Sequence, residues 1–115
     1  MSVAAIVLAA GASSRMGQPK ALLRWGDSTL VEHAVHTLDE AGVDRTVVVI
    51  GRHAQQIRNA LPERRRLVFN ARWGSGRATS LARGAWALRG STPEAVVIQN
   101  VDQPSTPQVL SLIHI

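Results

Sequence analysis

Four short segments of the chain are apolar at nearly every position. Continuous apolar runs are typical of strands that are buried on both faces of a sheet, whereas a strand with one wet face alternates apolar and polar residues. A glycine directly follows the first and the second run, which favours a turn at the end of each strand. The predicted strands are residues 3–10, 46–50, 67–69 and 95–99.

The segments between these strands carry apolar residues at helical spacing. The first such segment covers residues 29–41. Thr29 and Glu32 have the spacing of a capping box at its start, and Gly42 can end the helix. Two further helices are predicted, one over residues 54–61 and one that carries Leu81, Ala85 and Leu88.

Strands and helices therefore alternate along the whole chain. Alternation with strands that are buried on both faces predicts an α/β fold with three layers, α/β/α, around a mostly parallel, Rossmann-like sheet. Ligands of such sheets bind beyond the carboxyl ends of the strands. The loops expected at those ends are residues 11–20, 70–77 and 100–104, and they contain most of the candidate chemistry.

Composition restricts the possible classes of function. The chain has 115 residues, which suits one small domain, and 45% of them are hydrophobic, which favours a globular core. The absence of cysteine excludes disulfides and thiolate metal sites. With three Trp, one Phe and no Tyr, the chain does not resemble an aromatic platform for single-stranded nucleic acid. The net charge of +5 suits phosphorylated small molecules, nucleic acid or an anionic surface, so it does not choose between them.

The first residues give no sign of export or membrane insertion. No basic segment precedes the first apolar run, and this run stops at Gly11, which is too short for a membrane span. We expect a cytoplasmic protein without membrane partners.

Residues 8–20, LAAGASSRMGQPK, combine small residues with two cations. Ala9, Ala10 and Gly11 allow a ligand to approach the backbone, whose N–H groups can face phosphate oxygens. Arg15 offers a planar fork for a phosphate and Lys20 a compact charge. The segment lacks the Lys-Ser/Thr pair of a P-loop and the glycine spacing of a dinucleotide fingerprint. From these residues alone, a solvated surface loop is an equally good interpretation.

The same segment resembles the signature loop LAAGxSxRMGxxK of the NTP-transferase superfamily that includes the molybdenum-cofactor nucleotidyltransferases. The frame matches at nine positions, directly after a predicted buried strand. These positions are Leu8, Ala9, Ala10, Gly11, Ser13, Arg15, Met16, Gly17 and Lys20.

Two later segments extend the resemblance to residues 3–109. Residues 70–81, NARWGSGRATSL, are similar to the family's second loop and keep Asn70, Trp73, Gly76, Ser80 and Leu81. They depart from it at Ala71, where Pro is common, and at Arg77, where Met is common. Asp102 begins a segment that resembles the family's Asp-x-Pro loop, whose Asp binds Mg²⁺ in relatives.

The resemblance implies a nucleotide-diphospho-sugar transferase-like fold and transfer of CMP from CTP to the terminal phosphate of the molybdenum cofactor. Ala10, where guanylyltransferases usually have Gly, places the chain nearest to the molybdenum cofactor cytidylyltransferases. The resemblance further implies that CTP is bound along the first and second loops, that Arg15 and Lys20 hold the triphosphate, and that Asp102 holds Mg²⁺. The residues implied in nucleotide binding are Leu8, Ala9, Ala10, Gly11, Ser13, Arg15, Lys20, Asn70, Gly76 and Ser80. A molybdenum hydroxylase or its maturation factor is the implied protein partner.

Other interpretations stay open at this stage. A related enzyme could use GTP or another phosphorylated acceptor, and an accessory protein could bind nucleotide without catalysis. His33 and His36 are three residues apart on one predicted helix, but without a third ligand they are better explained as structural. Trp25, Trp73 and Trp86 are most simply packing residues. The run Arg64-Arg65-Arg66 suits a solvated surface better than a nucleic-acid patch, so no nucleic-acid partner is expected.

The last residues suggest a foreign tail. LSLIHI, residues 110–115, is what the transposon-adapter sequence CTGTCTCTTATACACATC encodes when it is read in frame. We therefore expect residues 1–109 to be the N-terminal, nucleotide-binding part of one nucleotidyltransferase domain, truncated at its C-terminus, and residues 110–115 to be an adapter-derived, non-native tail. On this interpretation the chain lacks the edge of its sheet and its acceptor half, and is inactive alone. The alternative is a genuine short helix that starts at Thr106.

Overall fold

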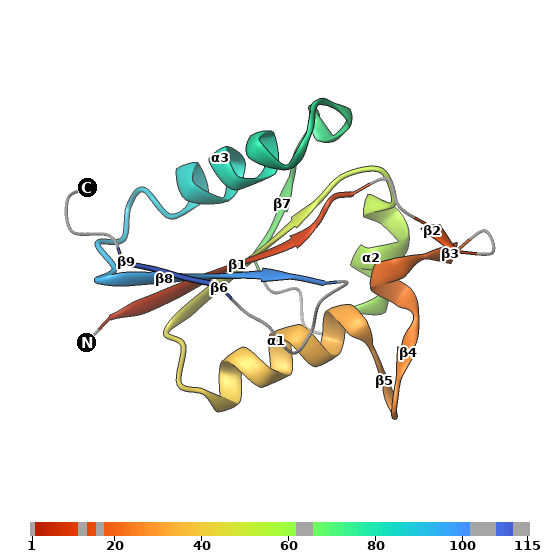
Figure 1. Cartoon of the computed structure of the whole chain (residues 1–115), viewed down its shortest axis with the longest axis horizontal. Coiled ribbons are helices and arrows are strands. Elements are labelled where there is room, and N and C mark those ends of the chain that lie inside the picture. Colours follow the sequence, from red (N-terminus) through yellow and green to blue (C-terminus); the bar gives the residue numbers. More distant parts are fainter. Residues whose placement is uncertain (1, 12–13, 16–17, 62–65, 102–107, 112–115) are drawn as a thin grey trace.

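A computed structural model describes residues 2–11, 14–15, 18–61, 66–101 and 108–111. Its largest sheet has five strands in the order β7-β6-β1-β8-β9, and Figure 1 shows α3 on one side of this sheet and α1 on the other. The elements of this layered part are β1 (Val3–Ala9), α1 (Leu30–Glu40), β6 (Arg45–Ile50), α2 (Ala54–Ala60), β7 (Arg66–Phe69), α3 (Arg77–Ala87), β8 (Ala95–Asn100) and β9 (Gln108–Ser111).

The sheet is mostly parallel, as the sequence predicts. Strand β1 pairs in parallel with β6 and β8, and β6 pairs in parallel with β7. Strand β9 runs antiparallel to β8 and covers its outer edge. The α/β prediction, with helices on both faces of the sheet, is confirmed.

Alternation along β1 divides the core into two layers. Ala5, Val7 and Ala9 belong to the cluster that contains the buried faces of α1 and α2. Ala4 and Ile6 belong to the cluster on the other side of the sheet, against which α3 packs. Because side chains alternate across a strand, an apolar residue at every position of β1 satisfies both layers at once.

Helix α1 begins and ends where the sequence predicts. The Thr29 hydroxyl accepts from the Glu32 N–H at 3.2 Å, and the Glu32 carboxylate accepts from the Thr29 N–H at 3.0 Å, which completes the capping box. At the other end Gly42 has φ = 86°, and the Val43 N–H donates to the Leu38 carbonyl at 3.2 Å. This pattern is a Schellman motif, which requires the left-handed conformation that glycine adopts without strain.

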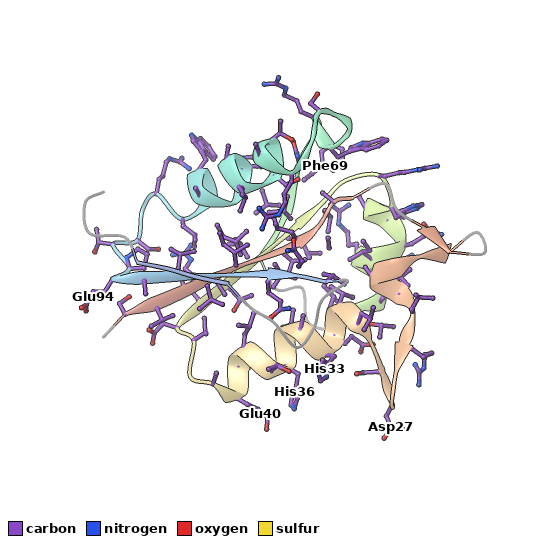
Figure 2. All side chains as sticks on the ribbon, in the orientation of Figure 1. Asp27, His33, His36, Glu40, Phe69 and Glu94 are labelled. Carbon is purple, nitrogen blue, oxygen red and sulfur yellow. The ribbon has the colours of Figure 1, made fainter. Side chains whose placement is uncertain are left out.

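The segment between β1 and α1 is more structured than a loop. It contains two short hairpins, the first of β2 (Ser14–Arg15) with β3 (Gln18–Pro19) and the second of β4 (Arg24–Trp25) with β5 (Ser28–Thr29). A 3₁₀ turn, η1 (Lys20–Leu22), joins them, and Asp27 lies at the tip of the second hairpin (Figure 2). Two-residue strands have no periodicity to read, so the sequence predicts only a loop over residues 11–19.

The C-terminal segment also differs from the expectation. Residues 108–111 form β9, so the alternative of a short helix starting at Thr106 is wrong for this part of the segment. The outer edge of β8 is paired with β9, and Leu110 and Ser111 of the expected tail contribute to that pairing. The origin of residues 110–115 stays a prediction.

Helix α3 approaches the sheet closely at Gly84. A Cβ atom at this position would lie 2.7 Å from Ile6 Cγ2, and a β-branched side chain in a strand has little freedom to move away. Gly84→Ala is expected to lower the free energy of unfolding by about 1–2 kcal/mol, because overpacking outweighs the gain in helix propensity. Chemical denaturation measures this change. Gly90→Ala is the control, since a Cβ there meets nothing within 4 Å, and equal stability of the two variants would contradict the packing argument.

None of the helices in the described ranges is both long enough and apolar enough to cross a bilayer.

Candidate functional site

The strand order reverses between β1 and β8. The chain passes from β1 to β6 and β7 on one side, and then returns over the sheet through α3 to place β8 on the other side of β1. Asn100 lies opposite Leu8 in this pairing, and the Val101 N–H donates to the Leu8 carbonyl at 3.3 Å. Loops that leave neighbouring strands in opposite directions open a crevice, which is where ligands of such sheets bind.

Small residues form the carboxyl end of β1 at this crevice. Ala9 and Ala10 are buried, whereas Gly11 is exposed and has open space where a side chain would project. Leu8 is half-buried and packs against the core on the α3 side. The predicted nucleotide-binding residues Leu8 to Gly11 therefore lie at the reversal of strand order, and the chain is exposed at Gly11.

Asn70 organises the second loop. This residue is 3% exposed, and its amide nitrogen donates to the hydroxyls of Ser80 at 2.9 Å and Thr79 at 3.0 Å. Its amide oxygen accepts from the Arg72 N–H at 2.9 Å. These bonds tie the end of β7 to the first turns of α3, so the side chains of Asn70 and Ser80 satisfy one another in this structure. Their predicted contact with nucleotide stays a prediction.

The start of α3 reaches the end of β8. Gly76 precedes the helix with φ = 112°, a conformation that favours glycine, and its carbonyl accepts from the Thr79 hydroxyl at 2.7 Å. Arg77 follows, and its Nε donates to Asn100 Oδ1 at 3.3 Å. The predicted site residue Gly76 therefore directly precedes Arg77, whose hydrogen bond to Asn100 reaches the crevice between β1 and β8.

A close approach at Gly51 holds the second loop over β1. A Cβ at Gly51 would lie 2.5 Å from Trp73 Cβ and 2.9 Å from the Ala10 carbonyl oxygen. Trp73, in the 3₁₀ turn η2 (Trp73–Ser75), packs against the core cluster on the α3 side. The prediction that Trp73 is a packing residue is confirmed. Sequence reasoning treated Gly51 as the end of a strand and missed this role, because the partner residues are distant in the sequence.

The remaining predicted site residues divide into two groups. The backbones of Arg15 and Lys20 belong to β2 and η1, in the segment that follows β1 along the chain. Their side chains lie outside the described part of the structure. Ser13 and Asp102 lie outside the described residues altogether. The predicted catalytic and metal-binding roles of Arg15, Lys20 and Asp102 stay predictions.

The histidines of α1 fit the structural interpretation. His36 Nε2 lies 3.1 Å from Glu40 Oε1, an i,i+4 pair with both side chains about 70% exposed (72% and 70%). Figure 2 shows His33, His36 and Glu40 along α1, on the side of the sheet opposite α3. Within the ranges that the structure describes, no three His, Asp or Glu side chains gather as metal ligands.

Comparison with known proteins gives one relative over most of the chain and a second over a shorter part of it. Nicotine blue oxidoreductase of Paenarthrobacter nicotinovorans is 39% identical over 104 residues, 89% of this chain and 50% of that protein. The "Probable molybdenum cofactor guanylyltransferase" of Bacillus mycoides is 52% identical over 46 residues, 40% of this chain and 22% of that protein. The chain thus spans at most about half the length of these relatives.

A solved structure and a family model agree with the fold. A nucleotidyl transferase from Methanothermobacter thermautotroptrophicus superposes with a TM-score of 0.77 at 31% identity, over 91% of this chain and 52% of that one. The model of the MobA-like NTP transferase domain matches residues 5–114, nearly the whole chain. The chain belongs to the MobA-like NTP transferase domain family.

Proposed function

We propose that the protein transfers CMP from CTP to the terminal phosphate of the molybdenum cofactor and releases pyrophosphate. The observation that carries the proposal is the end of β1, where Ala9, Ala10 and Gly11 meet the reversal of strand order with open space at Gly11. Membership of the MobA-like NTP transferase family supports nucleotidyl transfer as the type of reaction. The presence of Ala10, in place of the glycine usual in guanylyltransferases, favours CTP.

The reaction needs alignment of two anions more than it needs acid–base chemistry. An oxygen of the acceptor's terminal phosphate attacks the α-phosphorus of CTP, and the bond from this phosphorus to the bridging oxygen of the pyrophosphate breaks. In this proposal Arg15 and Lys20 bind the triphosphate and offset the charge that develops on its oxygens. The small residues at the end of β1 allow the nucleotide to approach the backbone.

Mg²⁺ is the expected metal, and Asp102 is the residue proposed to hold it. Mg²⁺ keeps several waters and binds through one or two carboxylates together with substrate phosphates, so a single protein carboxylate is compatible with it. Asp102 directly follows Val101, which is hydrogen-bonded to the end of β1. When bound, the ion neutralises charge on the triphosphate oxygens.

The identity of the nucleotide has a specific alternative. The guanylyltransferase relative, 52% identical over its 46 aligned residues, fits use of GTP as much as use of CTP. Arg77 also bears on the choice of nucleotide. It stands where Met is common in the family, and it lies at the start of α3 beside the crevice. The nucleotide is therefore the first variable to test.

A second candidate function is a redox reaction. The relative named nicotine blue oxidoreductase aligns with 89% of the chain, a longer stretch than the guanylyltransferase match. A protein of this kind would oxidise a nicotinamide or flavin donor in the presence of its substrate and release no pyrophosphate. Following donor absorbance beside pyrophosphate release separates the two candidates.

We further propose that the activity belongs to a longer protein than this chain. The chain spans 50% of the nicotine blue oxidoreductase and 52% of the superposed nucleotidyl transferase, so an acceptor site built from the other half would be missing. Residues 1–115 alone are then expected to give no turnover. In the cell we expect a cytoplasmic enzyme that passes its product to a molybdenum hydroxylase or its maturation factor.

The decisive experiment measures pyrophosphate release by the protein from the complete gene. Mg-CTP and Mg-GTP are each supplied with and without the molybdenum cofactor. Release from CTP that depends on the cofactor is the expected result. Release from GTP keeps nucleotidyl transfer but overturns the choice of base, and donor oxidation without pyrophosphate favours the redox candidate.

A further inference from the structure

The outer side of α3 carries an open groove whose lining shares one residue, Asn70, with the predicted nucleotide site. Its volume is about 490 Å³, which suits a large apolar side chain with its neighbours. The floor is the exposed, small face of the helix at Ala78 and Ala82, and Trp86 forms one wall. Arg72 and Arg83 complete the rim beside Asn70 and Thr79.

Trp86 is exposed and yet held in place. The sequence predicts a packing residue, but 54% of Trp86 is exposed, so this prediction is wrong. The guanidinium of Arg89 lies 3.4 Å from the centroid of its ring and that of Arg83 lies 4.9 Å from it. Arg83 is itself fixed, because its Nε donates to the Phe69 carbonyl at 3.2 Å. These contacts reduce the entropy that the ring loses when a partner covers it.

The composition of this surface is that of a protein-binding hot spot. Exposed tryptophan and arginine next to small apolar residues are the residue types that contribute most to protein interfaces. Phe69, the other large hydrophobic residue found exposed in the described part of the chain, precedes the groove residue Asn70. Because Arg89 already covers the Trp86 ring closely, the ring is less suited to stacking on a nucleic-acid base.

Charge indicates the chemistry of the partner. Residues 70–93, which include α3, contain four arginines and no Asp or Glu, whereas residues 26–44, which include α1, contain five Asp and Glu and no Lys or Arg. The two helices lie on opposite sides of the sheet (Figure 1), so the basic stretch with α3 and the acidic stretch with α1 are on different faces. Pairing α3 with α3 of a second copy would place arginine against arginine, which disfavours a symmetric dimer through this surface.

We propose that the groove on α3 is a docking site for a segment of a partner protein in which an apolar side chain is flanked by carboxylates. The apolar side chain lies on Ala78 and Ala82 against Trp86, and the carboxylates pair with Arg72 and Arg83. The groove shares Asn70 with the predicted nucleotide-binding residues, whereas Trp86 and Ala82, the residues changed in the test, do not belong to that site.

The test uses the full protein and a labelled synthetic peptide with one leucine between glutamates. A second peptide has lysines in place of the glutamates. Fluorescence anisotropy is expected to show binding of the acidic peptide that weakens with salt, and no binding of the basic one. Ala82→Glu, which places a carboxylate in the groove, and Trp86→Ala are each expected to weaken binding at least about tenfold.

Ala85→Glu is the matched control. Ala85 is an exposed alanine on the same helix but does not line the groove, so this variant is expected to bind the peptide within about twofold of the parent at 0.15 M salt. Thermal unfolding checks that both glutamate variants are folded. The proposal is overturned if the acidic peptide does not bind, if Ala82→Glu and Ala85→Glu weaken binding equally, or if a single-stranded oligonucleotide or a second copy of the chain occupies the surface instead.

Discussion

Gly51→Val is expected to lower the free energy of unfolding by about 3 kcal/mol or more. The first added carbon would lie 2.5 Å from Trp73 Cβ and 2.9 Å from the Ala10 carbonyl oxygen, and the two branches of valine extend the overlap. The Ala10 oxygen is part of the backbone that leaves the central strand of the sheet, so it cannot rotate away as a flexible side chain could. Trp73 is the neighbour that must move, and it carries the second loop with it.

This substitution tests the architecture of the candidate site as well as stability. If the second loop is displaced from the end of β1, nucleotide binding weakens together with the fold, which chemical denaturation and nucleotide titration measure separately. Gly74→Ala is the control in the same loop, because a Cβ at Gly74 meets nothing within 4 Å. A stable Gly51→Val variant that binds nucleotide normally would show that the approach of Trp73 to β1 is unimportant.

Lys20→Ala is expected to reduce kcat/KM for pyrophosphate release by about 10²–10³-fold in the complete protein, if the proposed transferase function is correct. The physical reason is the loss of a fixed positive charge beside the triphosphate, where charge develops during the transfer. Lys20 is the sole lysine of the chain, and it begins the 3₁₀ turn that follows the first hairpin. Thermal unfolding of the variant is measured beside its activity, so that loss of the charge is distinguished from loss of the fold.

Arg24→Ala is the matched control for this prediction. Arg24 is an exposed cation in the neighbouring hairpin, where its guanidinium donates to the Asp27 carbonyl at 3.1 Å. Removing this charge should leave pyrophosphate release within a few-fold of the parent. Equal losses in the two variants would point to a general effect of net charge, and full activity of Lys20→Ala would remove Lys20 from the proposed mechanism.

The layered fold could be predicted because each of its elements has a local signal. The apolar run of β1, the capping box at Thr29 and Glu32, and Gly42 at the end of α1 are all sequence patterns whose physical cause lies within a few residues. The short hairpins of β2 to β5 have no such signal, since two-residue strands are too short to show a period. Strand β9 was missed because it depends on pairing with β8 rather than on its own sequence.

The candidate site divides in the same way. The frame of small and cationic residues over residues 8–20 pointed to the end of β1 before the strand order was known, because its spacing is local. The hydrogen bonds of Asn70 with Thr79 and Ser80, the bridge from Arg77 to Asn100, and the contact of Trp73 with Gly51 join residues that are 9 to 23 positions apart. Sequence spacing alone does not show such contacts.

For this protein, the sequence by itself determined the α/β class, the ends of α1 and the loop frame after the first strand. Only the tertiary structure decided the order of the strands, the reversal beside β1, the close approach at Gly51 and the exposure of Trp86. The reason is physical: helix capping and apolar periodicity act between neighbours in the chain, whereas strand order and exposure depend on which distant surfaces pack together.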